Sequence, residues 1–230
     1  MRSIAVLAVI AAALAIGVSS AGAAHECDGL MVCVPRAGPW VVVPTGGGVP
    51  RPHVEFQLSC PRGYIVGGLD AELSQRAIDV SFVGDLGSPV NPGITTSRSA
   101  VFSASYVGGT ARAPSFRPHV GCLPASGGGT RVPTASGAVR PGHPTVRRVR
   151  VVRIQPGSAT VTRSCLAHER LVGAAHAVGF YSRTPPNASL VSSVSTTLAV
   201  RGERVVVQVR GDAEIGSVRA VVQVQAVCAA

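Results

Sequence analysis

Two stretches that each begin at a cysteine decide the fold. Residues 60–71 read CPRGYIVGGLDA, and residues 165–177 read CLAHERLVGAAHA. When one position is inserted just after the first cysteine, a constant offset of 106 aligns Gly67 with Gly173 and continues to the closing cysteine of each copy. The opening and closing cysteines are 62 positions apart in the first copy and 63 in the second. The sequence therefore predicts one module written twice.

Residues around these cysteines alternate between apolar and polar side chains, as in strands with one buried face. The apolar faces hold Val54, Phe56, Leu58 and Cys60; Phe116, Pro118, Val120 and Cys122; and Val218, Ala220, Val222, Val224, Ala226 and Cys228, whereas Arg219, Gln223 and Gln225 are expected to face away. Six cysteines permit fifteen pairings. The repeat selects Cys60–Cys122 and Cys165–Cys228, which leaves Cys27–Cys33, and each long bridge stabilises its module by about 4 kcal/mol in the chain-entropy model.

The remaining sequence also has the composition and pattern of β-strands. Val occurs 38 times, and short apolar stretches end at Gly, Pro, Asn or Ser. We predict an all-β fold of two tandem small β-sandwich modules, immunoglobulin-like in the broad sense, each with one internal disulfide. The predicted order is a segment 25–37 with the Cys27–Cys33 loop, module 1 at 38–125, a Gly/Ser/Pro-rich linker at 126–143 that acts as a flexible joint, and module 2 at 144–230.

The first 24 residues are typical of a secretory signal peptide. Arg2 precedes an apolar run from Ile4 to Val18, and small residues follow, so cleavage is expected after Ala23 or Ala24. The run is too short for a comfortable membrane span, and no later window is apolar enough for one. The predicted localisation is secreted or extracellular, with cell-wall association as an option, and exported cysteines are expected to form disulfides.

All 21 basic residues are Arg, against 11 acidic residues. The absence of Lys excludes a Walker A loop, Schiff-base chemistry and Ser/Lys chemistry. Six Arg and no acid fall within residues 126–157. Arg147, Arg148, Arg150 and Arg153 are one candidate contact for an anionic polymer. The alternative is an edge strand whose solvated Arg residues discourage aggregation, or codon bias of a GC-rich genome.

Candidates for chemistry are few. His168, Glu169 and His176 match no common metal spacing, and no nucleophile elbow is present, so the sequence assigns no catalytic, cofactor or metal residue. Asp70, Glu72 and Asp79 are interpreted as solvated carboxylates. Four aromatic residues offer either a sugar-binding surface or core packing, with packing favoured: Tyr64, Tyr106, Phe180 and Tyr181.

The first copy keeps Cys60-Pro61-x-Gly63 followed by Gly67-Gly68, whereas the second copy lacks the Pro and the double Gly. This pattern resembles disulfide-stapled repeat modules of uncharacterised secreted proteins from high-GC Gram-positive bacteria. The resemblance implies a cell-surface or extracellular setting and no known chemistry. The sequence thus favours a non-enzymatic interaction or structural protein and does not identify its ligand; an anionic cell-wall polymer and another surface protein are the two partners considered. The alternatives are a polyanion binder that uses the Arg-rich strand and a secreted hydrolase with an unrecognised site.

Overall fold

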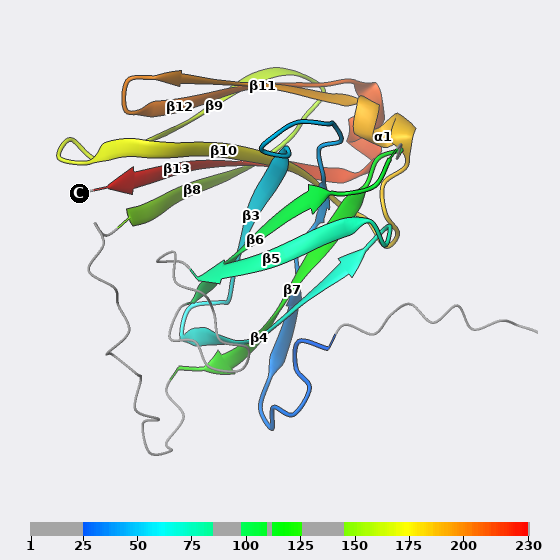
Figure 1. Ribbon diagram of the computed structural model, residues 1–230, viewed down its shortest axis with the longest axis vertical. Helices are drawn as coiled ribbons and strands as arrows, with labels where there is room; N and C mark the ends of the chain where they lie inside the picture. The colour runs from blue at the N-terminus through cyan, green and yellow to red at the C-terminus, as the bar shows by residue number, and fades with distance from the viewer. Residues whose placement is uncertain (1–24, 85–97, 110–111, 126–144, 230) are drawn as a thin grey trace, which may run out of the picture.

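The computed structural model describes residues 25–84, 98–109, 112–125 and 145–229, and within them the chain is all-β, as predicted (Figure 1). The predicted signal peptide and the predicted linker lie outside these residues. The strands of the first half are β1 Val34–Ala37, β2 Trp40–Val42, β3 His53–Ser59, β4 Tyr64–Leu73, β5 Ile78–Gly84, β6 Ser99–Tyr106 and β7 Ser115–Pro124. Those of the second half are β8 Thr145–Arg153, β9 Gly157–Ser164, β10 Arg170–Tyr181, β11 Val194–Arg201, β12 Arg204–Gly211 and β13 Arg219–Ala229, with short helices α1 Ala188–Ser192 and η1 Ala213–Ser217.

The strands pair in the same order in both halves. In the first half, β7 pairs with β4 on one side and with β1 and β2 on the other, and β3, β6 and β5 form a separate sheet. In the second half, β13 lies between β10 and β8, and β12 pairs with β11. Strand β9 runs beside β12, where the Cys165 amide donates to the Glu203 carbonyl at 3.0 Å. Each of β3, β4, β5, β6 and β7 therefore has a counterpart among β9 to β13.

Three disulfides join the cysteine pairs that the repeat selects: Cys27–Cys33, Cys60–Cys122 and Cys165–Cys228. Each long bridge connects the loop after a strand of one sheet to a strand of the facing sheet. Each also belongs to its own hydrophobic cluster, one per half. The alternation of apolar residues around the cysteines explains this placement, because it directs both sulfur atoms into the space between sheets.

The strand register relates the two halves by a different alignment from the predicted one. Gly68 lies opposite Gly121, and Gly173 lies opposite Val227, which is the counterpart of Gly121 at an offset of 106. Gly173 therefore corresponds to Gly68, not to Gly67. The cysteines are spaced similarly in the two halves although two connecting segments differ in length, in opposite directions. The second half inserts α1 between β10 and β11, whereas the first half has a longer segment between β5 and β6.

The two halves share one continuous sheet, and β2 is the strand that joins them. Val41 pairs with Phe116 of β7 on one side and with Gly179 of β10 on the other. Val41 belongs to the first hydrophobic cluster, whereas Val42 packs against the second. The contact between the halves thus consists of ordered strands, and the flexible joint expected from the linker composition is not the only connection.

A second contact between the halves buries Gln223 and Gln225, which face away from the apolar side of β13 as expected. Their exposed fractions are 1% and 0% because this face of β13 packs against β3. The Gln223 side chain accepts from the Gln57 amide at 2.6 Å and donates to the Gln57 carbonyl at 2.9 Å. Gln225 donates to the Glu55 carbonyl at 3.0 Å and to the Gln223 oxygen at 2.9 Å. Alternation correctly separated the two faces of β13, but both faces are buried.

Close contacts explain the double glycine of the first half: Leu123 of the neighbouring strand restricts Gly67, and the N-terminal loop restricts Gly68. A Cβ at Gly67 would lie 2.4 Å from Leu123, and a Cβ at Gly68 would lie 1.8 Å from the carbonyl oxygen of Glu26. Gly121, on the neighbouring strand, is as close to the same carbonyl, at 2.1 Å. Glycine is therefore required where the loop before Cys27 crosses β4 and β7. At Gly173 a Cβ would meet Val227 at 3.3 Å, which is a milder restriction.

We predict that Gln223→Ala lowers the free energy of unfolding by about 1–3 kcal/mol, because it leaves the buried amide and carbonyl of Gln57 without their partners. Chemical denaturation measures this loss. The matched control is Gln208→Ala on β12, where the glutamine is exposed and the expected change is within about 0.5 kcal/mol. Equal effects of the two substitutions would show that the Gln223 contact does not stabilise the fold.

Candidate functional site

The predicted Arg-rich strand is β8, at the edge of the shared sheet, and half of its arginines are already paired. Arg147 forms an ion pair with Glu55 of β3 and donates to Gln225 at 3.2 Å. Arg148 pairs with Glu169 through two hydrogen bonds, one of them 2.7 Å long. Arg150 and Arg153 are exposed. The structure therefore splits the four residues between internal ion pairs and solvent.

The Arg148–Glu169 pair has a clear electrostatic consequence. Hydrogen bonds from Arg148 and from the Leu166 amide stabilise the charged carboxylate, and they lower the pKa of Glu169 from its ordinary 4.5 to about 2. The same pair raises the pKa of Arg148. Glu169 is 7% exposed. It sits in the turn that carries Cys165, so this ion pair anchors β8 beside the second disulfide.

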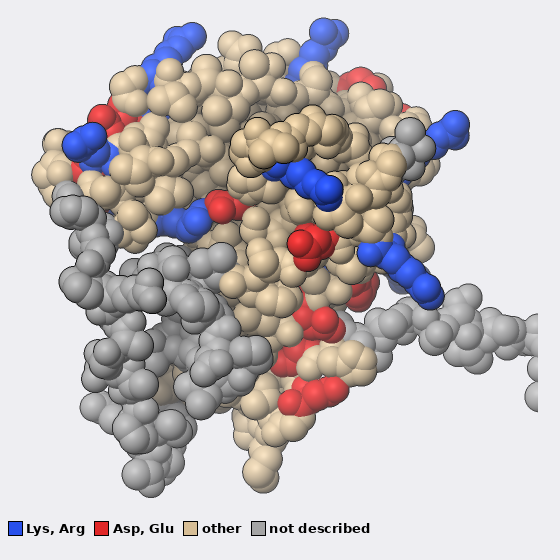
Figure 2. Space-filling view, in the orientation of Figure 1, with Lys and Arg blue, Asp and Glu red and all other residues tan. Residues whose placement is uncertain are grey.

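Positive charge is concentrated on the second half. Residues 145–229 contain eleven Arg and four acidic residues, whereas the described residues of the first half contain seven Arg and six acidic residues. On the face drawn in Figure 2, arginine side chains lie mainly over the second half, at the top of the view. Acidic side chains are seen at several places on the same face and gather mainly in its central and lower part. An anionic ligand would therefore be attracted to the second half.

Two hollows on the outer face of β9, β12 and β11 form the most suitable surface for such a ligand. Their volumes are about 490 and 470 Å³, and Thr160 lines both. We call the pair the β9–β12 groove. Its polar lining residues are Ser158, Thr160, Thr162, Ser164, Ser195, Thr197, Arg201, Glu203, Arg204, Gln208 and Arg210.

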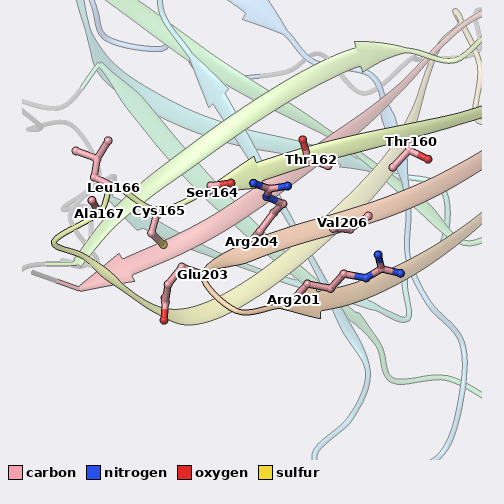
Figure 3. Close-up of a pocket in the computed structure, with 10 residues that line it drawn as sticks. All are labelled: Thr160, Thr162, Ser164, Cys165, Leu166, Ala167, Arg201, Glu203, Arg204 and Val206. Carbon is pink, nitrogen blue, oxygen red and sulfur yellow. The ribbon is translucent and has the colours of Figure 1, made fainter.

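The alternation of inward and outward side chains on three strands forms this groove. In β12, Val205, Val207 and Val209 point into the core, so Arg204, Gln208 and Arg210 point outward. Arg201 of β11 is directly opposite Arg204, and Ser195 is opposite Arg210. Figure 3 shows Thr160, Thr162 and Ser164 in succession along β9, with Arg204 and Arg201 on the neighbouring strands. Hydroxyl groups and guanidinium groups thus line the same face.

The three groove arginines are not neutralised within the described part of the chain. No carboxylate there lies within ion-pair distance of Arg201, Arg204 or Arg210, in contrast with Arg147 and Arg148. The single acidic residue of the lining, Glu203, accepts a hydrogen bond from the Leu171 amide. Three guanidinium groups therefore remain available for an external anion.

A third hollow, of about 520 Å³, lies at the junction of the halves. It is lined by Gln57, Ser59, Arg98, Ser99, Arg147, Val149, Val151 and Gln223. Most of its polar groups have internal partners: Ser59 and Ser99 are 2.6 Å apart, and Arg147 and Gln223 belong to the contacts described above. This hollow is polar, but it offers fewer free groups than the β9–β12 groove.

The candidates for catalysis and metal binding are not assembled into a site. His168 is exposed, and Glu169 is engaged by Arg148. The half-buried imidazole of His176 is 2.8 Å from the Thr196 hydroxyl, and partial burial lowers its pKa. Donor atoms of Cys165, Glu169 and Cys228 lie within 4.8 Å of one another, but the two sulfurs form a disulfide and offer no thiolate. Asp70, Glu72 and Asp79 lie on strands, and Asp70 and Glu72 contact the N-terminal loop and His119, respectively.

The aromatic candidates contribute mainly to packing. Phe180 is completely buried, and Tyr106 is 8% exposed. Tyr64 packs against the first hydrophobic cluster, and the Tyr181 ring lies 4.5 Å from the guanidinium carbon of Arg219. No aromatic residue lines the β9–β12 groove. The alternation of apolar and polar residues over 204–210 is visible in the sequence. Its outward Arg residues can be recognised as part of a candidate site only when β9 and β11 are seen to place hydroxyl groups beside them.

Comparisons of the chain with family models, with curated proteins and with solved structures found no match. Among the described residues, no helix is both long and apolar enough to cross a membrane.

The lowered pKa of Glu169 predicts an acid-sensitive contribution to stability. The carboxylate stabilises the fold fully above about pH 4.5, and this contribution disappears as the pH falls toward 2. Thermal unfolding of the wild type and of Glu169→Gln should therefore show a gap in midpoint that is largest near neutral pH and closes below pH 4.5. Asp79→Asn removes an exposed carboxylate of β5 outside the ion pair and serves as the control. A gap of the same size at pH 2 and pH 7 would contradict the role of the charged pair.

Proposed function

We propose that this protein is an exported, non-enzymatic β protein of two tandem sandwich modules, and that it binds an anionic polymer of the cell envelope through the β9–β12 groove. The observation that carries the proposal is the set of three unneutralised arginines, Arg201, Arg204 and Arg210, on a hollowed face rich in hydroxyl groups.

The repeated pairing order supports the tandem architecture. The strands β4–β7 with β3–β6–β5 correspond to β10–β13 with β9–β12–β11. Each half contains one long disulfide and one hydrophobic cluster. Duplication of one module accounts for both, and the shared strand β2 is then an adaptation that joins the copies.

Export is supported by the predicted signal peptide and by the disulfides. Three disulfides with no free cysteine among the described residues suit an oxidising compartment. A small domain with a thin core also benefits most from such bridges. A location at the cell surface or in the extracellular medium is the proposed setting.

The chemistry of the groove favours a phosphodiester chain over a neutral sugar. Guanidinium groups bind phosphate oxygens through two parallel hydrogen bonds, and serine and threonine hydroxyls can donate to the same oxygens. A neutral sugar ring is commonly recognised by stacking on an aromatic face, and the groove lining has no aromatic residue. Since Arg201 and Arg204 lie at one end and Arg210 at the other, a ligand with repeated charges can contact all three.

This proposal moves the polyanion contact away from β8. Arg147 and Arg148 would have to break their pairs with Glu55 and Glu169 before they could bind phosphate. Their proposed role is structural: Arg147 helps to hold the halves together, and Arg148 anchors the edge strand. The exposed Arg150 and Arg153 are proposed to protect the edge strand β8 against pairing with the sheet of another molecule.

The test is the binding of the mature chain to fluorescently labelled poly(glycerol phosphate) by anisotropy at several salt concentrations. We expect the logarithm of affinity to fall linearly with the logarithm of salt concentration, because bound guanidinium groups release counterions. Replacement of Arg201, Arg204 and Arg210 by Gln should weaken binding and reduce the slope by about 2, if each contact contributes about 0.7 as on a flexible single strand.

The matched control replaces Arg36, Arg62 and Arg76 by Gln. These arginines are exposed in the first half, and their loss changes the net charge equally. Equal weakening by both triple variants would mean that only the overall charge matters. Salt-insensitive binding, or no binding by the wild type, would refute the proposed function.

A further inference from the structure

The outward sides of β10 and β13 form the face of the second half that receives the first half. Strand β3 lies against this face, and the backbone N–H of Gln57 donates to the Gln223 side chain at 2.6 Å. Ala177 of β10 is buried and belongs to the hydrophobic cluster of the first half. We call this surface, which carries Ala175, Ala177, Gln223 and Gln225, the docking face of the second half.

The first half has the corresponding face on β4 and β7. The strand register shows the correspondence, since Ala175 pairs with Gln225 in the second half and Asp70 pairs with His119 in the first. The offset of 106 between β7 and β13 relates the same positions. The counterparts on the first half are Asp70, Glu72, Arg117, His119 and Gly121. The molecule therefore contains the docking face twice.

The N-terminal loop, residues 25–33, covers the docking face of the first half. Its Glu26 side chain is 6% exposed and lies 3.5 Å from His119 Nδ1. The carbonyl oxygen of Glu26 lies against Gly121, where a Cβ would be 2.1 Å from it. The same face is thus covered in both halves, by β3 in the second half and by a disulfide-closed loop in the first.

Strand β9 has the edge that corresponds to the docking edge of β3. The cysteines that follow these two strands align Thr162 with Gln57. The Cys165 amide donates to β12, and backbone groups point alternately to the two edges of a strand, so the N–H of Thr162 points away from β12. No strand in the described part of the chain is paired with that edge. The first half therefore uses its docking edge within the molecule, whereas the second half keeps its own edge for another partner.

We propose that the N-terminal loop is an end cap that prevents head-to-tail assembly, because it occupies the docking face on which β9 of a second copy would otherwise lie. Repeat architectures need such caps, since a terminal module exposes the surface that an internal module buries against its neighbour. A covered face also protects a sheet from contact with other molecules. The proposal rests on the tandem architecture proposed above but not on polymer binding.

The residues that differ between the two docking faces fit the different segments that cover them. Where β13 has two glutamines that bind the backbone of β3, β7 has Arg117 and His119, which face the carboxylates of Glu26 and Glu72. Where β13 has a valine, Gly121 leaves room for the Glu26 carbonyl. The first half is thus adapted to hold the loop in the place of another module.

A second copy is the partner that the charges of the two surfaces favour. Strand β9 lies beside the unneutralised Arg201, Arg204 and Arg210 of the β9–β12 groove. The docking face of the first half carries Asp70 and Glu72. Surfaces of opposite charge attract each other and select the correct alignment. Opening of the cap therefore allows a basic surface of one copy to meet an acidic surface of the next.

The experiment gives β7 the outward residues of β13. Arg117→Gln, His119→Gln and Gly121→Val introduce the residues that the second half has at these positions, and the new side chain at 121 displaces the Glu26 carbonyl. Analytical ultracentrifugation should find the wild type monomeric. The weight-average mass of the triple variant should rise with concentration and exceed that of a dimer, because a head-to-tail contact leaves both ends of the assembly open.

Two further variants complete the test. Thr162→Pro, added to the triple variant, removes the docking N–H from β9 and should abolish assembly; proline is tolerated on the free edge of a strand. Glu26→Arg changes the loop alone, places a positive charge beside Arg117 and His119, and should cause the same assembly with both sheets unaltered. It decides the question if near-ultraviolet circular dichroism shows that the triple variant is unfolded.

Three results would overturn the proposal. The first is a folded variant with an opened cap that stays monomeric at every concentration. The second is assembly that survives Thr162→Pro, and the third is equal assembly of the wild type.

The measurements separate this proposal from the proposed function. Assembly is measured without polymer, and polymer binding is measured on the wild type. Binding of poly(glycerol phosphate) by the wild type with no assembly of the variants would refute the cap alone. Assembly of the variants without polymer binding by the wild type would support the cap and refute the proposed function alone.

Discussion

The buried hydrogen bonds between β13 and β3 are the contact on which the arrangement of the two halves depends. Gln223 and Gln225 carry their polar side chains into a region that is shut off from water, where each unpaired group would be costly. They are satisfied there by the backbone of Glu55 and Gln57 in the other half, by each other and by Arg147. These hydrogen bonds hold β3 of the first half against β13 of the second, in addition to the pairing of β2 with β7 and β10.

Much of the fold follows from local sequence patterns. The alternation around Cys60, Cys122 and Cys228 places the sulfurs on buried faces, and the repeated spacing then selects the pairs. The patterns do not show which outward faces become buried by a second module. Gln223 is polar and lies on the face opposite to the core residues, so only tertiary packing distinguishes it from an exposed residue such as Gln208.

The candidate site was harder to predict for a related reason. A run of arginines is visible in the sequence, whereas their partners Glu55 and Glu169 are distant along the chain. Arg201, Arg204 and Arg210 are less dense in the sequence but gather on one face because β11 and β12 are paired. The position of the N-terminal loop is similar, since nothing local to His25 predicts that Asp70 lies within hydrogen-bond distance. The distribution of charge along the sequence therefore indicates which half carries the candidate site, but not which surface of that half.

The most direct test of this account is the ¹⁵N relaxation of backbone amides in both halves. If β2 and the glutamine contacts join the modules into one body, amides of β4 and β7 should report the same rotational correlation time as those of β10 and β13. Two distinct correlation times, as expected for modules on a flexible linker, would contradict the shared sheet and the surfaces derived from it.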